Sequence, residues 1–282
     1  NEAVVCYDLQ SGAVLWIHTD SGQYKTAIAG EGPRATPTIH NGKVYTLGAT
    51  GVLNCLELTT GKPVWQRHIA IDAGLDLDAP VDQSGLSSNR NKAKEWGYAS
   101  SPLIVDDKVV VSAGGENGKS LFAYDTAGGE PVWSGGNSRA GYSSARLAKL
   151  HDETQILIFN QDGLAAHSPN NGSVTWRFDW SAPYPHVSIP LSLPGNKVLL
   201  SLGYGKGSKL LQVDFGDGDY ADACGRGQDH DDGGLGRWSE CHRQESDDLH
   251  SRTLFGPVFW HEGRRCGWRL RSGGADGRHQ PA

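Results

Sequence analysis

Short apolar runs and polar turns alternate along residues 1–216 in a pattern that repeats. Each unit has a short apolar run, a polar turn, a β-branched run, a glycine-rich turn and a third run, then a further turn and a run that contains Trp. Turn glycines recur about every ten residues, and no segment keeps the 3.6-residue period of an amphipathic helix. The pattern therefore predicts units of four antiparallel strands joined by tight turns.

The last two strands of each unit share an eleven-residue signature. It occurs as CYDLQSGAVLW, CLELTTGKPVW, AYDTAGGEPVW and AHSPNNGSVTW. In every copy a glycine lies six positions after a small residue, and a tryptophan lies four positions after the glycine. These structural repeat positions are Gly12 and Trp16, Gly61 and Trp65, Gly129 and Trp133, and Gly172 and Trp176.

Recurrence in every unit indicates an architectural role, because a catalytic residue would occur once. A turn glycine supplies the positive φ that a tight hairpin requires. A tryptophan four residues later offers a large flat surface for packing between neighbouring units. We expect the four tryptophans to be equivalent and largely buried on outer strands.

Equivalent positions Pro37, Pro102, Ala145 and Pro190 give the length of the unit. They are 43 to 45 residues apart except for one interval of 65. Four-stranded units with this period predict an all-β fold, a β-propeller of four-stranded antiparallel blades, with about four to five blades in residues 1–216. The longer interval contains an insertion at residues 71–95, whose polar composition predicts a surface loop.

The signature, written small-x-D-x-x-[ST]-G-x-x-x-W, resembles the PQQ-like propeller repeat (PQQ is pyrroloquinoline quinone). That repeat occurs in quinoprotein dehydrogenases and in non-enzymatic relatives such as the bacterial outer-membrane assembly lipoprotein. The resemblance covers residues 1 to about 215. It implies a propeller that works outside the cytoplasm, in the periplasm or at the cell surface.

Three functions follow from this resemblance. The first is a non-catalytic binding or scaffold module whose partner is another protein. The second is part of a PQQ-dependent alcohol or sugar dehydrogenase, and the third is the sensor domain of a receptor-like kinase. The family's enzymes have an adjacent cysteine pair at the quinone, a bound Ca²⁺ and an Asp base. This chain has no Cys-Cys pair and no Asp on such a motif.

We therefore predict no catalytic residue, no metal site and no cofactor, with PQQ and Ca²⁺ expected only under the dehydrogenase alternative. Cys6 and Cys55 occupy the small position of the signature, where Ala123 and Ala166 stand in other copies. A free cysteine commonly behaves as a small buried hydrophobe, so both are expected to be buried and unreactive.

The stretch AGGENGKS, residues 113–120, matches a loosened phosphate-binding loop. Such a loop must lead into a helix whose N-terminal amides hold phosphate. The following residues, LFAYD, align with a strand of the repeat, so the stretch is predicted to be a hairpin tip. GYGKGSK, residues 203–209, occupies the same position in the fifth unit and is interpreted in the same way.

Charge and hydropathy exclude two further classes of partner. The net charge is -6 and the sequence pI is near 6.0, which leaves no basic footprint for nucleic acid. No apolar run approaches the roughly 20 residues that a membrane-spanning helix needs. The chain opens on Asn1 inside a repeat and contains no Met, so we expect it to be a piece of a longer protein.

The composition changes abruptly at residue 217. Residues 217–282 contain no Lys, no Ile and no Asn, a single Val, and nine Arg. Strands need β-branched residues, and their loss predicts that this tail does not continue the blades. Its composition is typical of a reading-frame error, with a disordered charged tail as the alternative.

Overall fold

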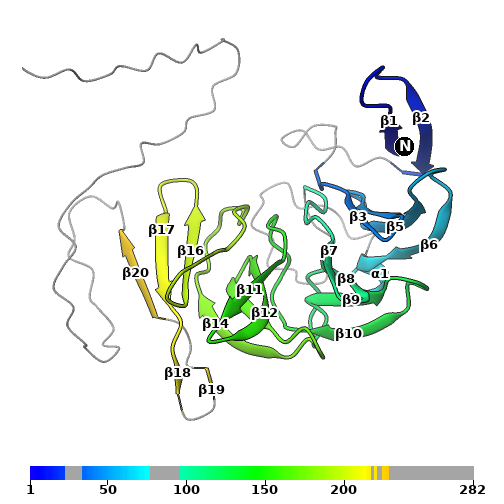
Figure 1. Cartoon of the computed structure of the whole chain (residues 1–282). Coiled ribbons are helices and arrows are strands. Elements are labelled where there is room, and N and C mark those ends of the chain that lie inside the picture. Colours follow the sequence, from blue (N-terminus) through cyan, green and yellow to red (C-terminus); the bar gives the residue numbers. More distant parts are fainter. Residues whose placement is uncertain (23–33, 77–95, 217–218, 221–223, 229–282) are drawn as a thin grey trace, which may run out of the picture. The chain divides into compact units, whose positions relative to one another are not determined.

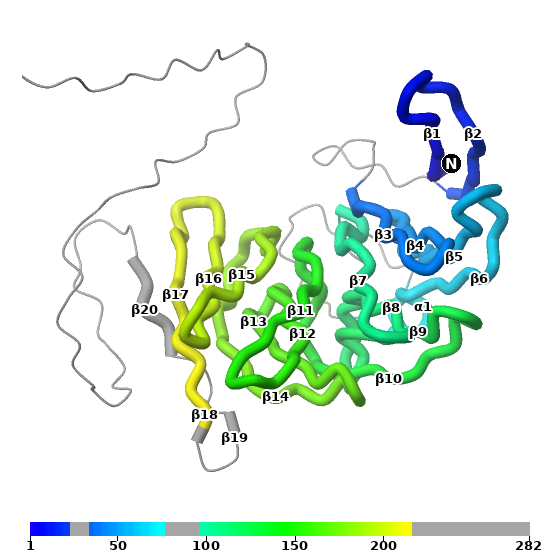
Figure 2. The backbone as a smooth tube through the Cα atoms, in the orientation of Figure 1, coloured from blue at the N-terminus to red at the C-terminus, as the bar shows by residue number. Residues whose placement is uncertain are grey.

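The computed structural model describes residues 1–22, 34–76, 96–216, 219–220 and 224–228. Most of the expected insertion (77–95) and of the expected tail (229–282) lies outside these residues. The described part is a β-propeller built from four-stranded antiparallel sheets, as the repeat predicts. The sheets follow one another in chain order, from blue to yellow in Figures 1 and 2.

The first unit is a half blade, and four four-stranded blades follow it. The half blade contains β1 (Glu2–Tyr7) and β2 (Val14–Asp20). The first complete blade contains β3 (Thr38–His40), β4 (Lys43–Leu47), β5 (Val52–Glu57) and β6 (Pro63–His68). The second contains β7 (Leu103–Val105), β8 (Lys108–Ser112), β9 (Leu121–Asp125) and β10 (Pro131–Gly135). The third contains β11 (Arg146–Leu150), β12 (Glu153–Asn160), β13 (Gly163–His167) and β14 (Val174–Asp179).

The last blade contains β15 (Leu191–Leu193), β16 (Lys197–Leu202), β17 (Gly207–Gln212) and β20 (Cys224–Gln228). Its fourth strand lies beyond residue 216, where we expected the blades to end. β20 pairs antiparallel with β17, so the sheet extends into the segment of altered composition. Between them, β18 (Phe215–Gly216) and β19 (Asp219–Tyr220) form a small separate hairpin.

The start of the expected insertion contributes to the core. Residues Ile69–Asp72 form α1, and the buried side chains of Ala73 and Leu75 follow it. These apolar residues pack in the same cluster as Tyr45, Leu53 and Val109 from the neighbouring strands. The described part of the insertion is therefore not a surface loop. A four-residue helix is too short to show a 3.6-residue period in the sequence.

The signature turn has the same hydrogen bonds in every copy. In the turn that follows β9, the amide of Asp125 donates to the carbonyl of Glu130, and the amide of Gly129 donates back to the carbonyl of Asp125. The Asp125 carboxylate also accepts from the amides of Ala127 and Gly128, at 3.0 and 2.6 Å. This Asx turn explains the acidic position of the signature. The turn glycine has a φ of +77°, a conformation that glycine adopts without steric cost.

Three of the four signature tryptophans lie against the turn glycine of the next blade. A Cβ at Gly129 would lie 2.6 Å from Cδ2 of Trp65, which belongs to the preceding blade. The Nε1–H of Trp65 donates to the carbonyl of Thr126 in the same turn, at 3.1 Å. Trp16 is placed in the same way over Gly61, and Trp133 over Gly172; their indole N–H groups donate to Leu58 and Pro169. The repeated glycine and tryptophan are thus two halves of one contact between blades.

The four tryptophans are equivalent in position but not in burial. Trp133 and Trp176 are buried, with 8% and 2% of their surface exposed. Trp16 and Trp65 are half-buried, which corrects the expectation that all four are largely buried. Trp176 also differs in its partner, because its Nε1–H donates to the side chain of Gln155 within its own blade, at 2.7 Å.

Candidate functional site

One edge of the blades holds the segments that join each blade to the next. The strands alternate in direction, so the segments that join one blade to the next lie at the same edge as the turns between second and third strands. We call this edge the linker face. Its described segments are residues 21–22, 34–37, 48–51, 69–76, 96–102, 113–120, 136–145, 161–162, 180–190 and 203–206. The signature turns lie at the opposite edge.

Two stacked aromatic pairs lie on the linker face. The rings of Trp96 and Tyr142, from consecutive linkers, have centroids 5.4 Å apart. The rings of Tyr184 and Tyr204 are 4.8 Å apart and nearly parallel. Tyr204 is 63% exposed, although Tyr and Trp side chains carry large apolar surfaces. Partly exposed aromatic rings held by stacking are ready-made contacts for another molecule.

Asn160 connects the segments that carry these rings. Its side-chain amide donates to the hydroxyl of Ser120 at 3.1 Å and accepts from the hydroxyl of Ser112 and the amide of Gly141. Its main-chain carbonyl lies 2.7 Å from Nδ1 of His186. Asn160 is only 1% exposed, and a buried amide that makes all these bonds fixes the segments it joins.

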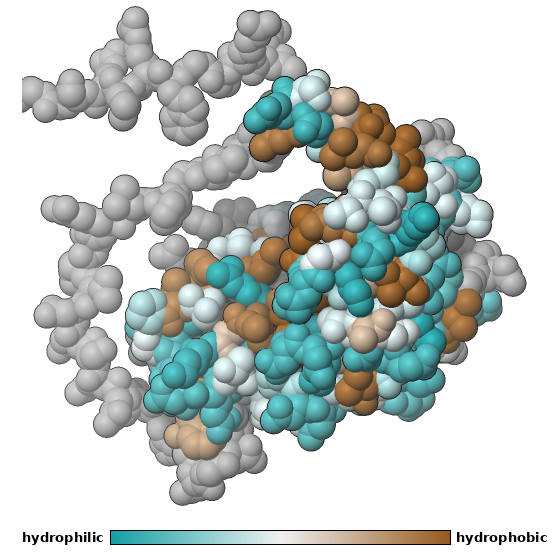
Figure 3. All heavy atoms as spheres, turned by 45° about the vertical axis from the view of Figure 1, so that its right-hand side comes forward, coloured by the Kyte–Doolittle hydropathy of each residue, from teal (hydrophilic) through white to brown (hydrophobic). Residues whose placement is uncertain are grey.

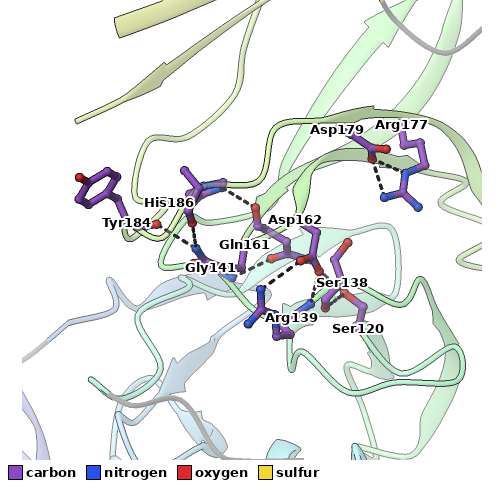
Figure 4. A network of polar contacts seen from close by, with 12 residues as sticks. Ser120, Ser138, Arg139, Gly141, Gln161, Asp162, Arg177, Asp179, Tyr184 and His186 are labelled. Atoms are coloured by element: carbon purple, nitrogen blue, oxygen red, sulfur yellow. Dashed lines mark hydrogen bonds and ion pairs between the residues drawn. The ribbon is translucent and has the colours of Figure 1, made fainter. Parts of the chain in front are cut away.

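Two further contacts hold the linkers in place, as Figure 4 shows. Arg139 forms an ion pair with Asp162, with 3.3 Å between the guanidinium and the carboxylate. The side-chain amide of Gln161 donates to the carbonyls of Ala182 and Tyr184, at 2.7 and 2.9 Å. The backbone of Tyr184, and with it the second aromatic pair, is therefore tied to the turn between β12 and β13.

A buried carboxylate joins the half blade to the first complete blade. Asp20 is 8% exposed and accepts from the side-chain amides of Asn54 and Gln66, at 2.6 and 2.9 Å. His18 lies 3.1 Å from the same carboxylate. This cluster could not be recognised from the sequence, because none of its residues recurs at the equivalent position of another unit. Each polar group has partners, as a buried charge requires.

The stretches singled out in the sequence lie in turns between strands, and Cys6 and Cys55 lie in β1 and β5. Residues Ala113–Ser120 join β8 to β9, and the residues that follow form a strand, which confirms the hairpin tip. Residues 203–206 likewise join β16 to β17. Cys55 is fully buried, and burial raises the pKa of its thiol. Cys6 is half-buried, contrary to expectation, because β1 has a partner on one side only.

Among the described residues, no group of three or more His, Cys, Asp or Glu side chains is arranged to hold a metal ion. Within the described ranges, no helix has the length and apolar character that crossing a bilayer requires.

Residues 1–190 match the family described as "Outer membrane protein assembly factor BamB". The chain belongs to this family. The BamB-family match covers the half blade and the first three four-stranded blades and reaches Pro190, just before β15. A search of the curated proteins gave no match.

Solved structures share the BamB-family fold at low sequence identity. BamB from Moraxella catarrhalis is 15% identical, with a TM-score of 0.51 over 79% of this chain and 58% of that one. A europium-containing methanol dehydrogenase is 17% identical, with a TM-score of 0.50 over 78% of this chain and 47% of that one. The quinohemoprotein alcohol dehydrogenase from Comamonas testosteroni is 15% identical, with a TM-score of 0.50 over 79% and 40%. The chain thus spans about half the length of these proteins, and the likeness concerns the fold alone.

Proposed function

We propose that this chain is a non-catalytic binding module that contacts another protein through its linker face, outside the cytoplasm. The observation that carries the proposal is the placement of two stacked aromatic pairs on that face. Aromatic residues are enriched where proteins bind one another, because their rings bury much surface and lose little conformational freedom. The extracytoplasmic location is carried over from the BamB family.

The charged groups of the linker face support binding over catalysis. Asp162 is paired with Arg139, and Asp72 accepts from Arg67 and from the hydroxyl of Tyr124. Asp20 is bonded to two amide side chains. These carboxylates hold segments of the protein in place, and a face held in this way loses little freedom when it binds a partner.

Site-specific photo-crosslinking tests the proposal. A photoreactive amino acid replaces Tyr204 in a chain exported to the bacterial periplasm, and a matched variant carries it at Val174. Val174 is also exposed, at 42%, but it begins β14 at the opposite edge of the blade. We expect a discrete protein adduct from position 204 and none from position 174. Equal yields at the two positions, or no adduct at either, would contradict the proposal.

A further inference from the structure

A group of aromatic and basic side chains lies on the linker face where the third complete blade joins the last blade. We call it the lysine–aromatic patch, and its members are Trp180, Tyr184, Tyr204, Lys206 and Lys209. Trp180 and Tyr184 belong to the linker, and the other three belong to the turn between β16 and β17 and to β17 itself. The Tyr184 ring stacks on the Tyr204 ring and points away from the polar contacts that hold its backbone (Figure 4). The patch therefore presents aromatic surface to solvent.

The two lysines of the patch carry charge that no carboxylate compensates. The Nζ of Lys209 lies 5.1 Å from the centroid of the Trp180 ring and 5.9 Å from that of Phe178. Lys206 follows Tyr204 by two residues, in the turn that leads into β17. No carboxylate of the described residues forms an ion pair with either ammonium group. A cation over an aromatic face is attracted to the ring but keeps its charge, so both lysines remain available to an anion.

The carboxylates next to the patch already have partners. Asp179, which precedes Trp180, is paired with Arg177, and Asp162 is paired with Arg139. The two lysines therefore give this part of the linker face a local positive charge. Hydrophilic side chains cover much of the face shown in Figure 3, and the chain as a whole has a net charge of -6. A positive area on an acidic protein is complementary to an acidic partner, which the rest of the surface repels.

We infer that the lysine–aromatic patch binds an acidic segment of the partner protein, in which carboxylates lie close to an aromatic or apolar side chain. The carboxylates pair with Lys206 and Lys209, and the apolar side chain packs on the exposed ring of Tyr204. Charge complementarity of this kind steers association and selects among partners. The inference rests on the proposed binding function and deepens it, because it names the chemistry of the partner.

The number of lysines favours a polypeptide over a membrane or a nucleic acid. Anionic lipid headgroups are recognised by clusters of about 4–8 basic residues. Nucleic acid is bound by a basic stripe that follows many phosphates along the backbone. Two charges beside aromatic rings match a short acidic motif in a protein instead.

Photoreactive peptides test the inference on the unmodified chain. The probe is a short labelled peptide of Glu, Pro and Phe in which one Phe is replaced by a photoreactive analogue. A second peptide has Gln in place of every Glu, and a third has Lys. We expect an adduct of the Glu peptide that peptide mapping places in residues 178–187 or 203–209, and about tenfold or more lower yields from the other two. Raising the ionic strength should lower the yield from the Glu peptide, because salt screens surface charges.

Charge-reversal variants assign the binding to the two lysines. Lys206→Glu and Lys209→Glu should each lower the yield of the Glu-peptide adduct by about tenfold or more. Lys119→Glu is the matched control and should retain the yield, because Lys119 is exposed on the same face, in the turn between β8 and β9. Lys206→Glu leaves the ring contacts of Lys209 in place, so it remains informative if Lys209→Glu disturbs the fold.

Four results would overturn the inference. They are no adduct with the Glu peptide, equal yields from the Glu and Gln peptides, the same loss in Lys119→Glu as in Lys206→Glu, and sedimentation with phosphatidylglycerol vesicles that Lys206→Glu abolishes. The last result would assign the patch to a membrane. If residue 204 crosslinks to a protein in the periplasm and Lys206→Glu leaves that adduct unchanged, the acidic partner is wrong and the linker face still binds a protein. The two proposals can therefore fail separately.

Discussion

At the scale of single residues, the signature glycine meets two requirements that are separable in this chain. Gly12 and Gly129 both have positive φ, +69° and +77°, in the same kind of turn. A Cβ at Gly129 would meet the ring of Trp65, whereas a Cβ at Gly12 would meet nothing within 4 Å. Both glycines adopt the left-handed conformation, but a tryptophan ring closely approaches only Gly129.

Replacing these glycines should separate the two effects. Gly12→Ala and Gly129→Ala both carry the left-handed penalty of about 1–2 kcal/mol. We expect Gly129→Ala to lower the free energy of unfolding further, because the added methyl group displaces the Trp65 ring. Urea denaturation followed by tryptophan fluorescence measures both. Equal losses in the two variants would mean that the ring contact contributes nothing.

The buried imidazole of His167 predicts a dependence of stability on pH. His167 is 1% exposed, its Nδ1 lies 2.9 Å from the carbonyl of Gly172, and burial lowers its pKa. The unfolded chain therefore takes up a proton below about pH 6.5 that the folded state resists. The stability that the neutral side chain supports is present above that pH and is lost as the pH falls.

His167→Gln should reduce the difference between the melting temperatures measured at about pH 7.5 and pH 5.5. Burial also lowers the pKa of His68, so part of the dependence should remain. A full pH dependence in the His167 variant would show that this side chain is not responsible.

At the scale of elements, the contact between neighbouring blades is the unit of stability. Trp133→Ala should lower the free energy of unfolding by roughly 3–5 kcal/mol, because it empties a large aromatic site and removes the hydrogen bond to Pro169. When Trp133→Ala is combined with Gly172→Ala, the two losses in free energy of unfolding should not add. In the double variant the new methyl group at residue 172 no longer meets the ring of Trp133. The coupling energy should fall within about 0.5–3 kcal/mol.

The matched control pairs Gly172→Ala with Trp65→Ala. Trp65 lies on Gly129, in a different contact, so these two losses should add within about 0.5 kcal/mol. Additive losses for the pair Trp133 and Gly172 would contradict the docking of one on the other.

The strands, turns and fold class could be predicted from the sequence, because each depends on local pattern. The packing of Trp65 on Gly129 could not be predicted from the sequence, because a fixed spacing within one unit does not reveal which unit receives the ring. Asp20, Asn54 and Asn160 were missed because they occur once, and single polar residues carry no periodic signal. β20 was missed because its composition, rich in Gly and Arg, lacks the β-branched residues by which strands are recognised.

At the scale of the whole molecule, the fold is shared by proteins with and without a cofactor, and the fold alone does not decide between them. We expect the purified chain not to bind PQQ, because it lacks the adjacent cysteines found in the family's enzymes. Titration with PQQ and Ca²⁺, followed by absorbance and by dye-linked alcohol oxidation, measures this directly. Saturable binding with turnover would favour the dehydrogenase alternative.

The packing of Trp16, Trp65 and Trp133 on the turn glycine of the following blade also has an evolutionary consequence. A unit with a complete signature carries both the tryptophan that packs on the next unit and the glycine that receives the preceding one. Tandem duplication of such a gene segment therefore produces a new copy whose contacts already match those of both neighbours. Such an array can lengthen without any new interface being invented, whereas a damaged signature weakens the joints on both sides of it. Trp176 is a signature tryptophan with a different partner, because it donates a hydrogen bond to Gln155 in its own blade.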